Sequence, residues 1–140
     1  MAVVLHAISR QSRATAMALL LPYLAFQILP INVEHYSFFP GTDGFGIYNR
    51  HVSIVLYVLV AGLLFLRGPA LGAVIGWTLT ALFLIKITGF LAGGLVTAFA
   101  LAAGRIGWRQ SLLIAAAGGL AALGLELATG LVSAYLDSIL

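Results

Sequence analysis

The chain has 140 residues, of which 62% are hydrophobic and 8% are charged, and its mean hydropathy is +1.12. This composition excludes a soluble globular domain and predicts an integral membrane protein. The net charge of +3 comes from seven Lys and Arg residues against four Asp and Glu, spread along the chain rather than gathered on one solvated face, which excludes nucleic-acid binding. The absence of cysteine excludes disulfides, thiolate ligands and thiol nucleophiles.

The apolar runs do not alternate with a period of two residues, so they predict membrane helices rather than a barrel. We expect the first helix at about residues 14–32, after Arg10 and Arg13, with a kink near Pro22. Secretory signal peptides also begin with basic residues that are followed by an apolar segment. No small-residue cleavage site follows here, however, so we expect the helix to be retained. An outer loop is expected at residues 33–50.

A second, short helix is expected at about residues 51–66, before a turn at Arg67-Gly68-Pro69. The next apolar run, from Ala70 to Ala103, would form one helix about 51 Å long, whereas the hydrocarbon core of a bilayer is about 30 Å thick. Thr88 and Gly89 nearly halve this run, so we divide it into two helices. The sequence thus predicts an all-α bundle of five transmembrane helices, the last three at about residues 70–87, 90–103 and 110–136. The alternative is four helices, with one long or re-entrant segment.

The basic residues favour five crossings, because Lys and Arg in short loops gather on the cytoplasmic side of a membrane. With a cytoplasmic N-terminus, five crossings leave only Arg50 and Lys86 in the outer half. Four crossings would move the last two arginines outside. The arginines that five crossings bring to the cytoplasmic side are Arg10, Arg13, Arg67, Arg105 and Arg109.

The outer loop is rich in aromatic residues, which predicts that it lies at the membrane interface. The alternative is a docking surface for an external partner. Glu34, His35, Asp43 and His51 match no zinc or calcium spacing, so we predict no metal site. The residues of the candidate docking loop are Phe39, Pro40, Asp43, Phe45 and Tyr48.

Small residues recur at helical spacing in the last three predicted helices, which allows helices to approach closely in lipid. These stripes predict helix-packing faces in a compact bundle, without identifying the partner helix. The candidate packing residues are Gly72, Gly76, Gly93, Thr97, Gly104, Ala115, Gly119 and Ala122.

Two ionisable residues, Lys86 and Glu126, fall inside apolar helices, where a lone charge costs at least about 2.5 kcal/mol. Each lies sixteen residues beyond the expected start of its helix, so both rise about 24 Å and reach the same depth. We therefore predict an intramembrane ion pair. In one alternative Lys86 extends to the headgroups and Glu126 is protonated; in another Glu126 couples transport to a proton or cation.

No catalytic group is visible, because none of the three histidines lies deep in a helix beside a nucleophile or an acid. No glycine-rich phosphate loop is present either. We therefore expect no enzymatic activity and no cofactor. The remaining enzymatic hypothesis is a lipid-directed activity that uses His35, Asp43 and Arg50 at the outer surface.

One apolar helix ends in Ile87-Thr88-Gly89-Phe90, a short second one closes at Gly104-Arg105, and Trp108-Arg109 open the last. Together with the chain length, the helix count and the pair Phe39-Pro40, this pattern resembles the small membrane subunit of tripartite tricarboxylate transporters. The resemblance covers about Leu79 to Leu136. Gly41 after Pro40, and Glu126 in the last helix, depart from the family's pattern.

The resemblance implies an accessory subunit of a bacterial inner membrane that braces a large polytopic transport subunit. A periplasmic solute-binding protein would deliver the carboxylate, and the outer loop would lie near it. The alternative from another class is an accessory helical subunit of a respiratory or photosynthetic complex. In a third reading the chain is an independent carrier, which would require Glu126 for transport.

Overall fold

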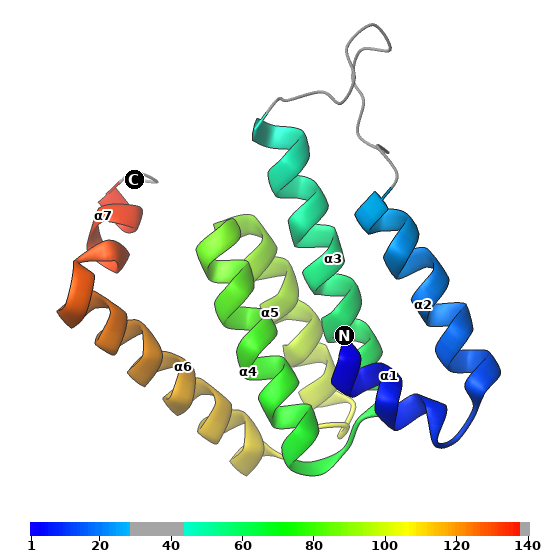
Figure 1. Cartoon of the computed structure of the whole chain (residues 1–140). Helices are drawn as coiled ribbons and strands as arrows, with labels where there is room; N and C mark the ends of the chain where they lie inside the picture. The colour runs from blue at the N-terminus through cyan, green and yellow to red at the C-terminus, as the bar shows by residue number, and fades with distance from the viewer. Residues whose placement is uncertain (29–43, 138–140) are drawn as a thin grey trace, which may run out of the picture.

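The computed structural model describes residues 1–28 and 44–137, without the side chains of residues 44–48, 117 and 121. Within these ranges helices joined by short connections make up the chain, and there is no strand (Figure 1). The helices are α1 (Ala2–Ser9), α2 (Arg13–Ile28), α3 (Gly44–Phe65), α4 (Gly68–Ile85), α5 (Ile87–Ala102), α6 (Trp108–Thr129) and α7 (Leu131–Asp137).

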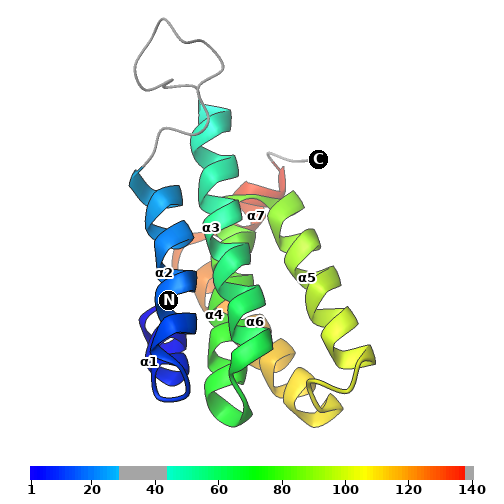
Figure 2. The same cartoon turned by 90° about the vertical axis from the view of Figure 1, so that its right-hand side faces the viewer.

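Two of these helices, α4 and α6, are long and apolar enough to cross a membrane by length and composition. Three apolar stretches are shorter: Arg13–Ile28, Asn49–Phe65 and Ile87–Ala102. The connections at residues 10–12, 66–67 and 103–107 lie at the same end of the molecule in both views (Figures 1 and 2). Because each of these connections carries or adjoins an arginine, we call this the arginine end.

The first helix, α1, was not predicted, because the sequence analysis began its helices at residue 14. Val4 and Ile8 lie one turn apart on α1 and are almost fully buried, and α1 packs against α2 and α3. Ser12 then accepts a hydrogen bond at Oγ from the backbone N–H of Thr15 (3.2 Å), which caps the first turn of α2. The chain therefore begins with a short helix across the arginine end.

Helix α3 begins at Gly44, inside the stretch predicted as the outer loop 33–50. That prediction is wrong for residues 44–50, which add two turns to the second predicted helix. The helix continues through Gly44 and Gly46, although glycine is a weak helix former. Residues 29–43, which include Phe39, Pro40 and Asp43, lie outside the described part of the chain.

The run from Ala70 to Ala103 forms two helices, α4 and α5, as the length argument predicted. The break lies at Lys86 rather than at Thr88 and Gly89, and Lys86 is extended (φ −164°, ψ 125°) at the end of α4 and the start of α5. Phe83 and Phe90 pack edge to face across this break, with ring centroids 5.5 Å apart. The charged residue, rather than the glycine, terminates the helix.

The core lies where α3, α4 and α5 meet. Leu59 on α3 and Leu82 on α4 are fully buried, and both lie against the backbone of Gly93 on α5. A Cβ atom at Gly93 would lie 2.6 Å from Leu82 Cδ1, so only glycine permits this spacing. Gly89, one turn earlier, faces Val52 on α3 in the same way. These three helices therefore form the tightly packed part of the molecule.

The last predicted helix, 110–136, is interrupted. Helix α6 ends where Gly130 adopts the left-handed conformation (φ 63°), and the N–H of Gly130 donates to the carbonyl of Glu126 (2.8 Å). A glycine reaches this conformation without strain, so it closes α6 and redirects the chain into α7. Helix α6 packs against α4 and leans away from the rest of the bundle toward α7 (Figure 1).

Candidate functional site

Lys86, at the turn between α4 and α5, directs its side chain toward α3. Its Nζ donates a hydrogen bond to Oδ1 of Asn49 at 2.8 Å. Asn49 lies near the beginning of α3, at the end of the bundle opposite the arginine end. The ammonium group is thus held at the edge of the apolar region rather than inside it, where its desolvation would be most costly.

Glu126 directs its side chain along its own stretch of chain. Its Oε2 accepts a hydrogen bond from the backbone N–H of Ser133 at 2.9 Å, across the turn at Gly130. This N–H belongs to the first turn of α7 and has no partner within that helix. The carboxylate therefore fastens α7 to the end of α6.

The predicted ion pair between Lys86 and Glu126 is not formed among the described residues, because each side chain has another partner. Both residues lie at or near the C-terminal ends of helices that begin at the arginine end, Lys86 directly after α4 and Glu126 in the last turn of α6. The two side chains have different neighbours. Lys86 is hydrogen-bonded to α3, whereas Glu126 is hydrogen-bonded to α7, which follows the break at Gly130. A sequence analysis that treats 110–136 as one helix cannot find the α7 contact.

The predicted packing residues divide into two groups. Gly93 is closely packed against leucines of α3 and α4. Gly72 lies against Gln110 of α6, because a Cβ atom added at Gly72 would be 3.2 Å from the Nε2 atom of Gln110. Gly76 and Gly119, by contrast, have nothing within 4 Å of an added Cβ. Gly104 has a positive φ of 68° and forms the turn after α5, so its role is conformational rather than one of packing.

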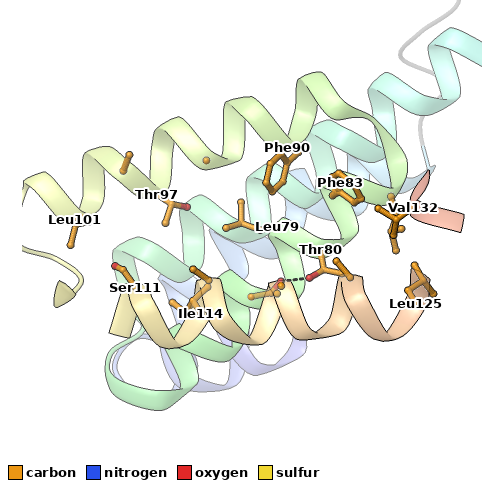
Figure 3. A pocket seen from close by; sticks show the side chains of 18 residues that line it. Leu79, Thr80, Phe83, Phe90, Thr97, Leu101, Ser111, Ile114, Leu125 and Val132 are labelled. Atoms are coloured by element: carbon orange, nitrogen blue, oxygen red, sulfur yellow. Dashed lines mark hydrogen bonds between the residues drawn. The ribbon is translucent and has the colours of Figure 1, made fainter. Parts of the chain in front are cut away.

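The second group lines a groove between α4, α5 and α6, with a volume of about 720 Å³ (Figure 3). Phe83 and Phe90 lie toward one end of this groove, and Leu101 and Ser111 lie toward the other (Figure 3). The predicted packing residues that line it are Gly76, Thr97, Ala115, Gly119 and Ala122. The residues predicted to pack helices together therefore include some that line this groove and some that lie in a closely packed interface.

The hydroxyl groups of the groove are bonded to their own helices. Thr80 donates to the carbonyl of Gly76 at 2.9 Å (Figure 3), and Thr97 donates to that of Gly93 at 2.8 Å. Ser111 donates to the carbonyl of Gly107 at 3.4 Å. No charged residue lies among the described residues that line the groove. The groove therefore offers a hydrocarbon surface, which suits apolar side chains or acyl chains and does not suit an ionic solute.

Two side chains that the sequence analysis did not predict join the helices at the arginine end. Arg105 donates to the carbonyls of Leu63, Leu64 and Leu66 at 2.6 to 2.9 Å, and so caps the C-terminal turn of α3. Gln110 donates from Nε2 to the carbonyl of Gly68 at 2.9 Å. No local pattern signals either contact, because the partners are about forty residues apart in the chain.

The described residues contain no group of three or more His, Asp and Glu side chains that could hold a metal ion. Glu34, His35 and Asp43 of the candidate loop lie outside the described part of the chain. Phe45 and Tyr48 belong to the first turns of α3. Comparison with family models, with curated proteins and with solved structures finds no match to this chain.

Proposed function

We propose that this chain is a small accessory subunit of a larger membrane complex, and that it packs against a larger membrane protein through α4, α5 and α6. The groove between these helices is the observation that carries the proposal. Its lining is mostly apolar and carries no charge among the described residues, and its small side chains leave room for side chains of a neighbouring helix. In the candidate membrane span of α6, none of the residues whose side chains the structure describes is buried within the chain.

In this proposal α2, α3, α4, α5 and α6 cross the membrane, and the arginine end lies on the cytoplasmic side. A sixteen-residue helix such as α2 or α5 rises about 24 Å, which is shorter than the hydrocarbon core. Local thinning of the bilayer, or cover by a larger neighbour, accommodates such helices. A cysteine placed at position 103 should then react with a maleimide only from the cytoplasmic side, and one placed at position 134 only from the outside.

The complex that we propose is a tripartite carboxylate transporter of the bacterial inner membrane, as the resemblance of residues 79–136 implies. The chemistry of the groove favours an accessory subunit of such a complex over a protein that carries the substrate by itself. A carboxylate needs cationic or hydrogen-bonding partners along its path, and the groove lining offers hydroxyls that are already bonded. The large subunit would therefore carry the substrate, and a periplasmic binding protein would deliver it.

Photo-cross-linking from inside the groove tests this function. A photoreactive residue at position 119 should cross-link to a large polytopic membrane protein in native membranes, and mass spectrometry should identify it. The control is position 64 on α3, where Leu64 is 65% exposed but lies outside the groove. Cytochromes or pigment proteins as cross-linked partners would assign the chain to an energy-transducing complex instead. Cross-linking to lipid alone would contradict the accessory role.

A further inference from the structure

The charges of this chain are divided unequally between the two ends of the bundle. Five of its seven basic residues, at positions 10, 13, 67, 105 and 109, lie at the arginine end. The four acidic residues of the whole sequence are Glu34, Asp43, Glu126 and Asp137, and none of them lies in the segments that form this end. The arginine end therefore carries a positive charge that neither of the acidic side chains in the described ranges, Glu126 and Asp137, neutralises, and this charge attracts anions.

Hydrogen bonds gather three of these arginines in one place. Arg67 lies between Leu66 and Gly68, whose carbonyls accept hydrogen bonds from Arg105 (2.8 Å) and Gln110 (2.9 Å). These hydrogen bonds join the turn between α3 and α4 to the loop between α5 and α6 and to the first turn of α6. Arg109 directly precedes Gln110 and therefore belongs to the same cluster.

Several of these arginines have no partner within the described part of the chain. Arg10, Arg13 and Arg67 are exposed and make no side-chain hydrogen bond or ion pair there. Arg109 stacks on Trp108, with its guanidinium carbon 5.6 Å from the ring centroid, and Trp108 is 63% exposed. Tryptophan concentrates at the level of lipid headgroups, so this pair suits the boundary between hydrocarbon and water.

Large apolar side chains adjoin the arginines on the same helices. Leu64 precedes Arg67 by about one turn, and Leu112 and Leu113 follow Arg109 by about one turn. All three are mainly exposed, and Leu113 is 72% exposed. An acidic soluble protein bound to the arginines would match their charge but would leave these leucines uncovered, in contact with water or lipid. A phospholipid matches both features, because its acyl chains cover the leucines while its phosphate reaches the guanidinium groups.

We infer that the arginine end binds phospholipids with a net negative headgroup, through Arg67, Arg105 and Arg109 and with Arg10 and Arg13 alongside. Arg105 contributes positive charge while its guanidinium caps α3, and Arg67 and Arg109 engage the phosphate directly. This inference concerns the isolated chain and does not depend on the partner protein of the proposed function.

The test is native mass spectrometry of the purified full-length chain, extracted in neutral detergent with equal amounts of phosphatidylglycerol and phosphatidylcholine of the same acyl composition. The wild-type chain should retain phosphatidylglycerol preferentially. In the double variant Arg67→Gln/Arg109→Gln, this preference should fall at least about fivefold, since one basic residue near an anionic surface contributes about that factor.

The matched control is Arg50→Gln/Lys86→Gln, which removes the same charge from the opposite end and should keep the wild-type preference. A second variant, Arg13→Gln/Arg67→Gln, changes only side chains that have no partner within residues 1–28 and 44–137, so it tests the site if the first variant unfolds. Equal retention of the two lipids by the wild-type chain would overturn the inference. An equal loss of preference in the variants of both ends would also overturn it, because net charge rather than this end would then determine lipid binding.

Discussion

Helices α5 and α6 both carry glycines that face α4, yet the two helices are packed very differently. Gly93 of α5 lies so close to Leu82 that a Cβ atom would be 2.6 Å from it, whereas Gly119 of α6 has nothing within 4 Å. A stripe of small residues therefore permits close packing without causing it. Helix α5 packs closely against both α3 and α4, whereas α6 contacts the α3–α4 turn through Gln110 and is followed by α7, whose Tyr135 packs against Phe83 of α4.

The largest effect that we expect comes from enlarging the packed glycine. Gly93→Leu should destabilise the isolated chain by about 3 kcal/mol, because the added side chain meets Leu82 and Leu79 in a close-packed interface. Thermal unfolding in detergent, followed by circular dichroism, measures the change. An unchanged melting temperature would show that α4 and α5 are not packed as described.

Removal of the Arg105 side chain should have the next largest effect. Arg105→Gln loses hydrogen bonds from a charged group to three carbonyls of α3, which should cost about 2 kcal/mol in the free energy of unfolding. Arg67→Gln is the matched control, because Arg67 has no side-chain partner in the described part of the chain. If both variants unfold at the same temperature as the wild type, Arg105 does not join the two halves of the bundle.

A smaller effect is expected at the ends of α4 and α6. Glu126→Gln should loosen α7, and Lys86→Gln should loosen the contact with Asn49. Because the two side chains have separate partners, the changes in melting temperature should add in the double variant. If the double variant is no less stable than either single variant, the result would support the ion pair predicted from the sequence.

The smallest effect on the isolated chain is expected at the open glycine. Gly119→Leu should leave the melting temperature unchanged or slightly raise it, because leucine favours a helix more than glycine and the groove has room. In native membranes the same variant should lose the partner of the complex on size-exclusion chromatography. Retention of an intact complex would exclude the groove as the contact surface.

Local chemistry allowed part of this fold to be predicted. The length of the apolar run from Ala70 to Ala103 required two helices, and the structure contains two. The exact break was missed, since α4 ends at Ile85 and the extended residue is Lys86, before the glycine is reached. The groove was detected only as a set of small residues, because sequence spacing places residues on one face of a helix but does not show what that face contacts.

The sequence by itself determined the helical class, the apolar character of the long helices and the gathering of arginines in the connections between them, because these depend on composition and on order along the chain. Tertiary structure alone decided which glycines are packed, which carbonyls Arg105 caps and where Lys86 and Glu126 direct their side chains. Those outcomes depend on the direction in which each helix leaves its turn. The left-handed Gly130 sets that direction for α7, and the extended Lys86 sets it for α5.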